Sequence, residues 1–253
     1  MRIIAVARNT FREAVRDKVL YVLLFFAAVT IFGSKALGWV SIGQDIKIVK
    51  DICLAATSAF GVLIAIFVGT SLVYKEIDKR TLYTILSQPM HRYEFVLGKY
   101  FGLVALLAVV VLVMTGVTAA YVLILGGALD GVFFLAVLLI FFKLLLITAF
   151  AILMSSLSSP ILGAVIVFSA YVFGHATGVF MNLPPQLAET AAADMLRAAY
   201  YVIPNLSNFD IRAEAANGVP IRAAYVLWAM VYGLLYTVVL LILAALAFEG
   251  KDV

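Results

Sequence analysis

Few side chains in this sequence are of types that carry out chemistry, and those few are far apart. Lys143 is the one formal charge near the middle of a long apolar stretch. An ammonium group there costs a few kcal/mol unless it is paired or hydrated. Lys143 therefore either faces a polar pathway or is satisfied by carbonyl and hydroxyl groups of a neighbouring helix. Of the two histidines, His91 lies in a polar interval and His175 lies near the far end of an apolar stretch. They are expected on opposite sides of the membrane, so no histidine metal cluster is expected.

Other reactive arrangements are missing from the sequence. There is no G-x-x-x-x-G-K-S/T run that would hold a nucleotide phosphate. No apolar stretch has Asp or Glu at its centre, which argues against an intramembrane proton relay. The single cysteine, Cys53, has no partner for an internal disulfide. We therefore expect this chain to be neither an enzyme nor the holder of a metal or cofactor.

The composition is that of a protein whose main solvent is lipid. Of the 253 residues, 65% are hydrophobic and 13% are charged, and the mean hydropathy is +1.13. A soluble domain of this size needs more charge on its surface. The apolar runs are continuous rather than alternating, which favours helices over a barrel. The net charge of +4 comes from basic residues beside apolar runs, so lipid headgroups rather than nucleic acid are the expected partner.

The chain is expected to form one transmembrane domain over residues 1–253, an all-α integral membrane protein with six spans. Residues 1–18 form a basic amphipathic helix, with Arg8, Arg12 and Arg16 on one face, that lies in the headgroup region. Residues 182–222 form a second amphipathic segment that lies on the membrane surface or dips into it. The six predicted spans are residues 19–39, 52–74, 100–125, 132–154, 161–181 and 223–248.

Small residues recur at four-residue spacing in two of these spans. Gly61, Ala65 and Gly69 form one stripe, and Gly174 and Gly178 form another. Such stripes let two membrane helices approach closely. We expect both to serve helix packing, within one chain or between two.

Residues 75–99, KEIDKRTLYTILSQPMHRYEFVLGK, separate the second and third spans but have helical periodicity of their own. Leu82 and Ile85 fall on one apolar face, and Pro89 ends that helix. His91 then stands at an N-cap position, with Glu94 three residues later, where its carboxylate reaches the free amides. This helix, break and helix is either a solvated loop or a docking element.

The distribution of basic residues sets the orientation. In the six-span arrangement, eleven Lys and Arg lie on the side of the termini and of residues 75–99, and six lie on the other side. The larger number belongs in the cytoplasm. Both termini and residues 75–99 are thus expected to be cytoplasmic, and residues 182–222 extracytoplasmic.

At this point the sequence resembles a known family. Residues 75–99 are similar to the segment after the second span in permeases of the ABC type-2 exporter family, with His91 where that family usually has Ser or Thr. The runs ARNTFREAVRDKVLYVLLFF, SSLSSP, IPNLSNFDIR and FEGKDV resemble the branch with accessory permeases for maturation of copper enzymes such as nitrous oxide reductase.

The resemblance implies a six-span permease, an exporter in the inner membrane of a prokaryote. It would pair with a second copy or a homologous permease and with a separate ATPase subunit, which binds ATP and Mg; a periplasmic accessory protein is a further possible partner. The ATPase would dock on a coupling helix between spans 2 and 3. The docking residues would be Glu76, Arg80, Thr81, Leu82, Ile85, Pro89 and Glu94.

Two other functions remain open. The chain could be a membrane anchor or scaffold that docks a partner without moving a substrate. A secondary transporter driven by an ion gradient would normally need buried acids, which the predicted spans lack. The scattered hydroxyls of the spans fit lipid, peptide, drug or sulfur-containing cargo equally, so the substrate stays open.

Overall fold

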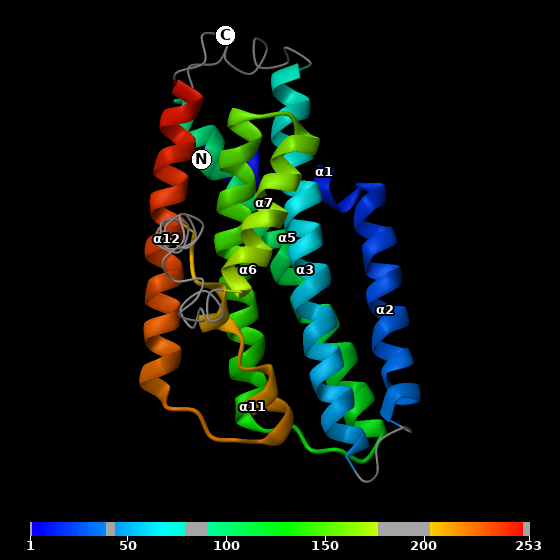
Figure 1. The fold of residues 1–253 in the computed structure, drawn as a ribbon. Helices are drawn as coiled ribbons and strands as arrows, with labels where there is room; N and C mark the ends of the chain where they lie inside the picture. The colour runs from blue at the N-terminus through cyan, green and yellow to red at the C-terminus, as the bar shows by residue number, and fades with distance from the viewer. Residues whose placement is uncertain (1, 39–43, 79–90, 177–202, 250–253) are drawn as a thin grey trace, which may run out of the picture.

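The computed structural model describes residues 2–38, 44–78, 91–176 and 203–249, all of which are helical or irregular (Figure 1). Residues 1, 39–43, 79–90, 177–202 and 250–253 lie outside this description. The elements are α1 Arg2–Val15, α2 Lys18–Gly38, α3 Asp45–Asp78, α5 Arg92–Ile124, α6 Gly131–Leu157, α7 Pro160–His175, the short 3-10 helix η1 Leu206–Phe209, α11 Arg212–Asn217 and α12 Ala223–Glu249.

Within the described residues, five helices are long and apolar enough to cross a membrane: α2, α3, α5, α6 and α12. The expected all-α membrane fold is therefore confirmed, whereas a sixth span is not established. The helix at the predicted fifth span, α7, is apolar but has 16 residues, which is about 24 Å of helix against about 30 Å of hydrocarbon. The remainder of that predicted span, residues 177–181, lies outside the description.

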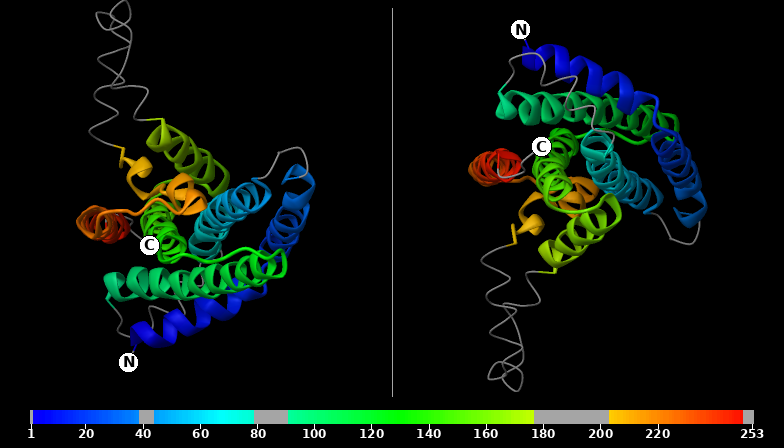
Figure 2. Two further views of the ribbon diagram at one scale, coloured as in Figure 1. Left: turned by 90° about the horizontal axis from the view of Figure 1, so that it is seen from below. Right: turned by 90° about the horizontal axis from the view of Figure 1, so that it is seen from above.

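Helix α6 is the centre of the bundle. It packs against α12 and α3 most extensively and against α5 and α7 less so, and Figure 2 shows these four helices around it. Its buried residues include Phe133, Leu139 and Ile147. The outward faces of α2 and α12 carry exposed apolar side chains such as Phe25 and Trp228, as expected for surfaces in contact with lipid tails.

One predicted helix start is confirmed, and another helix begins at a proline that was not predicted to start it. At the start of α5, the backbone N–H of His91 donates to the Glu94 carboxylate over 3.1 Å. At the start of α7, Pro160 follows Ser159 in the first helical turn, where a missing amide hydrogen costs nothing. The turn between α5 and α6 needs Gly126, whose φ of 79° is the left-handed region that favours glycine.

The polar stretch expected between the first two spans is mostly helical. Helix α2 continues to Gly38 and α3 begins at Asp45, so most of its polar residues belong to helix ends. Asp45 lies in the first turn of α3, where a negative charge is favourable. Lys50, which is buried, reaches Asp130 at the start of α6 over 3.3 Å. This ion pair joins the ends of α3 and α6.

The described part of the expected surface segment, residues 203–222, packs into the helix bundle and is called the inserted segment below. Leu206, Phe209 and Ile211 are buried, because η1 packs against α6 and α7 while α11 packs against α3 and α6. A Cβ added at Gly233 would lie 2.9 Å from the Phe209 ring, and Gly233 is about 15 Å along α12 from its start. Irregular backbone is tolerated at that depth because protein surrounds it.

Candidate functional site

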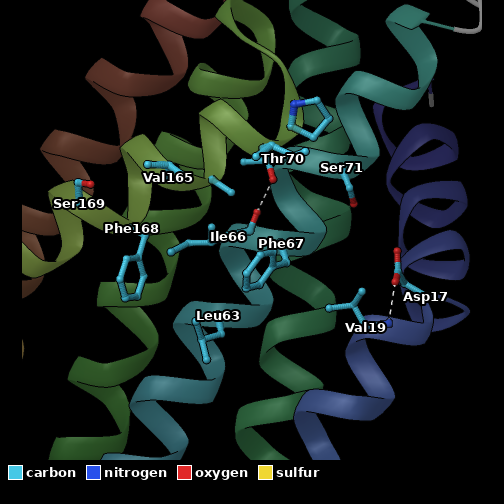
Figure 3. Close-up of a pocket in the computed structure, with 13 residues that line it drawn as sticks. Asp17, Val19, Leu63, Ile66, Phe67, Thr70, Ser71, Val165, Phe168 and Ser169 are labelled. Carbon is cyan, nitrogen blue, oxygen red and sulfur yellow. Dashed lines mark hydrogen bonds between the residues drawn. The ribbon is translucent and has the colours of Figure 1, made fainter.

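A groove between α3 and α7 is one of the hollows in the surface of the described residues (Figure 3). Its volume is about 580 Å³. Leu63, Ile66 and Phe67 of α3 form one wall, and Val165 and Phe168 of α7 form the other. The start of α2 bounds its edge. The groove is therefore a half-open apolar trough rather than an enclosed pocket.

Three of the four polar side chains that line the groove, Asp17, Thr70 and Ser71, have hydrogen-bond partners. The Thr70 hydroxyl donates to the Ile66 carbonyl over 2.8 Å, as Figure 3 shows, and the Ser71 hydroxyl donates to the Val68 carbonyl over 3.2 Å. The Asp17 carboxylate accepts from the Val19 N–H over 2.9 Å. The groove thus presents an apolar surface that fits an apolar or amphipathic molecule.

Most of the predicted docking residues cannot be placed. Arg80, Thr81, Leu82, Ile85 and Pro89 lie outside the described residues. Glu76 lies in the last turns of α3, and its side chain also lies outside the description; Glu94 lies in the first turn of α5. The structure does show which helices bracket this element. They are α3 and α5, of 34 and 33 residues, each about 50 Å long and so longer than the hydrocarbon is thick.

The predicted small-residue stripes lie at two internal contacts. A Cβ added at Gly61 would lie 2.8 Å from Leu144 on α6, and one at Gly69 would lie 3.0 Å from Ala151 on the same helix. Ala65 between them is buried. Gly174 packs against the inserted segment (residues 203–222), because a Cβ added at Gly174 would lie 2.8 Å from the Pro204 carbonyl oxygen. Gly178 lies outside the described residues.

A third close contact, between α1 and α5, was missed by the sequence reasoning. A Cβ added at Gly98 would lie 2.6 Å from Val6, and one at Gly102 would lie 2.6 Å from the Ala7 carbonyl oxygen. Lys99, between the two glycines, is 1% exposed and lies 3.7 Å from the Glu13 carboxylate. The G-x-x-x-G spacing of residues 98–102 is the signal that could have found it.

Lys143 lies in a buried polar cluster and not in the groove. Its ammonium group donates to the Ser58 hydroxyl of α3 over 2.6 Å, and Lys143 is 1% exposed. The inserted segment supplies two charges that act on it electrostatically, Asp210 and Arg212. The Ser207 hydroxyl donates to the His175 carbonyl over 3.1 Å. Helices α3, α6 and α7 and the inserted segment, which are distant in sequence, therefore come together near Lys143.

Asp210 and Arg212 form a two-pronged ion pair. Arg212 Nε donates to Asp210 Oδ1 over 2.7 Å, and a terminal guanidinium nitrogen donates to Oδ2 over 2.8 Å. Burial alone raises the pKa of Asp210, but the hydrogen bonds and charge of Arg212 outweigh it and hold that pKa below its ordinary value. Asp210 is therefore ionised at neutral pH. No three His, Cys, Asp or Glu side chains among the described residues come together as a metal site.

These observations define a multi-pass helical membrane protein with an apolar groove and a polar cluster beneath it. The chain matches the family model of ABC-2 family transporter proteins over residues 4–253, and it belongs to that family. It is thus a membrane permease subunit of an ABC transporter, a class in which ATP hydrolysis lies in a separate subunit. No curated protein matches the chain.

Proposed function

We propose that this chain is the permease of an ABC exporter and that a separate ATPase drives it through residues 75–99. One observation carries the proposal. Helix α3 forms one wall of the groove from Leu63 to Ser71 and then continues without interruption to Asp78, so it includes the first residues of the coupling element. Ser71 and Asp78 are about 10 Å apart along the helix. A push on the coupling element therefore moves a wall of the groove directly.

The groove also supports pairing of two permeases. Its α7 wall carries strongly exposed apolar residues, including Ile161 at 81% and Val165 at 56%. A second copy, related by a twofold axis, would place its own groove opposite and enclose a pathway between the two. The resulting cavity would be apolar on both sides, which suits a cargo that is itself largely apolar.

The proposed setting is the inner membrane of a prokaryote with both termini in the cytoplasm. The end of α3 at Asp78, the start of α5 at Arg92 and the end of α12 lie at the same end of the bundle (Figure 1). The Arg92 guanidinium donates to the Phe248 carbonyl over 2.9 Å, which ties α5 to α12 there. The excess of Lys and Arg at this end favours the cytoplasm.

The inserted segment is proposed to close the far end of the pathway. Residues 203–212 are the run IPNLSNFDIR, one of the runs that resembles the branch of permeases for copper-enzyme maturation. This run carries Asp210 and Arg212 to the vicinity of Lys143. Movement of the segment would change the surroundings of Lys143. Lys143 would then stabilise the closed state of the pathway. It would contact the cargo only after the pathway has opened.

The docking surface is tested by co-purification with the ATPase encoded beside the gene. The unmodified chain should retain the ATPase, whereas Leu82→Asp and Glu76→Lys should lose it. Lys47→Glu, an exposed charge change at the opposite end of α3, is the matched control and should retain it. Retention of the ATPase by both docking variants would refute the assigned surface.

A membrane anchor would dock the same ATPase without transport, so a second experiment separates the two functions. In a Cys53→Ala background, Val165→Cys should form a disulfide between two copies, and ATP hydrolysis should change its rate of formation. Trp228→Cys, at an exposed position on α12, should not respond to ATP. An ATP-independent rate at Val165 would favour the anchor.

A further inference from the structure

Helix α1 presents two opposite faces to two different surroundings. Thr10 and Ala14 are buried against the bundle, on the side where α1 meets Gly98 and Gly102 of α5. Arg8, Arg12 and Arg16 are exposed, and at 100° per residue they fall on the opposite side of the helix. Figure 2 shows α1 lying along the outside of α5. Its basic face therefore points away from the protein.

The three arginines have no ion pair with any residue that the structure describes. The acidic side chains near them are already engaged, because Glu13 pairs with Lys99 and Asp17 accepts from the Val19 N–H. Arginines four residues apart on one helix face repel each other. The chain thus holds a row of like charges that nothing in its described part neutralises.

A polar pocket lies along this face. Its volume is about 510 Å³, and Asn9, Arg12 and Arg16 line it together with Glu13 and Asp17. Helix α2, which enters the membrane, begins at Lys18, immediately after the pocket. The pocket therefore lies at the level of the phospholipid headgroups.

We propose that Asn9, Arg12 and Arg16 bind the phosphate of an anionic phospholipid. Two guanidinium groups supply the charge and a fork of donors that matches phosphate oxygens. The phosphate relieves the repulsion between the two arginines, which no ion pair with a described residue offsets. A lipid with net negative charge is favoured over a zwitterionic one, because a choline group would place a cation beside the arginines.

The lipid site also anchors α5, the helix that follows the coupling element. This consequence rests on the proposed function. Glu13 lies in the pocket and pairs with Lys99 of α5. Helix α5 begins at Arg92, directly after residues 79–90. A lipid that holds α1 in the headgroup layer therefore holds the first turns of α5 as well, and gives the coupling movement a fixed support.

The test measures lipid retention by the full chain in detergent. Phosphatidylglycerol and phosphatidylcholine with the same acyl chains are added in equal amounts, and retained lipid is counted by native mass spectrometry. The chain should retain phosphatidylglycerol in preference. Arg12→Gln with Arg16→Gln should reduce that retention roughly tenfold or more, since each basic residue contributes about fivefold. Lys35→Gln with Lys47→Gln, exposed lysines at the other end, should change nothing.

Equal retention of the two lipids, or unchanged retention in the arginine variant, would overturn the site. Displacement of the lipid by millimolar inorganic phosphate would do the same, because the ligand would then be a free anion. Folding of each variant is checked with Cys53, which is buried and should stay unreactive to a maleimide.

A second readout separates the lipid site from the proposed function. In nanodiscs that contain the chain and its ATPase, phosphatidylglycerol should stimulate ATP hydrolysis, and the arginine variant should lose that stimulation. Lost retention with unchanged stimulation would overturn the coupling consequence. Lipid retention by a chain that binds no ATPase would instead contradict the proposed function and leave the site supported.

Discussion

Lys99 and Lys143 are both 1% exposed, yet the protein holds them in different ways. Lys99 lies near the end of the bundle that carries α1, 3.7 Å from the Glu13 carboxylate and 5.6 Å from the centre of the Phe95 ring. Lys143 lies near the middle of α6, and its hydrogen-bond partner is the neutral Ser58 hydroxyl. One lysine has a carboxylate within ion-pair distance, and the other depends on a hydroxyl and on more distant charges.

The difference shows what each lysine is sensitive to. Glu13 and Phe95, which contact Lys99, belong to α1 and to its own helix. These two helices are fixed to each other by Gly98 and Gly102. The charges that act on Lys143 belong to the inserted segment, which the chain reaches only after residues 177–202. A buried ammonium group without a close counter-ion is costly. Lys143 is therefore the lysine whose free energy changes when a neighbouring element moves, and Lys99 is a fixed clamp.

Replacement of Lys143 should have the largest effect on function. Lys143→Met should abolish transport while assembly with the ATPase survives, because methionine fills a similar volume and removes an ammonium group that is costly to bury. The loss of function is measured as transport of a fluorescent apolar cargo in proteoliposomes. Lys35→Met, an exposed lysine of α2, is the control. Normal transport by Lys143→Met would remove Lys143 from the pathway.

Separation of α1 from α5 should have the next largest effect. Gly102→Leu places a side chain where a Cβ already lies 2.6 Å from the Ala7 carbonyl oxygen, and should destabilise the protein by about 3 kcal/mol. Gly116→Leu on the same helix is the control, since nothing lies within 4 Å of its Cβ. The stability of both variants is measured by the reaction of the buried Cys53 with a maleimide during heating. Equal stability of the two variants would show that α1 is not clamped there.

Loss of the Ser58 hydroxyl should have a smaller effect. Ser58→Ala removes the hydrogen bond of a buried ammonium group and should cost about 2 kcal/mol. Thr57→Ala is the control, because the Thr57 hydroxyl donates to the Cys53 carbonyl of its own helix over 2.9 Å. The same thermal measurement compares them. A cost for Thr57→Ala as large as that for Ser58→Ala would mean that Lys143 does not depend on Ser58.

Neutralisation of Glu13 should have the smallest effect. Its side chain is 37% exposed, so water screens the ion pair, and Glu13→Gln should cost less than about 1 kcal/mol. The cost should fall further at high salt. A loss as large as that of Gly102→Leu would show that charge rather than close packing holds α1.

The sequence predicts the parts of this fold that depend on local chemistry. The His91–Glu94 pair marks a helix start because its effect reaches only one turn. The inserted segment could not be predicted in the same way. The burial of Leu206 and Phe209 depends on space that Gly174 and Gly233 leave in two other helices, and that space exists only after the bundle has assembled. The burial of Lys99 likewise depends on the docking of α1.

The central claim is that energy enters the permease through residues 75–99 on the cytoplasmic side. It is tested most directly by labelling intact cells with a membrane-impermeant maleimide, in a Cys53→Ala background. Arg80→Cys should react only after the inner face is made accessible, whereas Lys47→Cys, at the start of α3, should react in intact cells. Reaction of Arg80→Cys from outside the cell, with Lys47→Cys protected, would contradict the account.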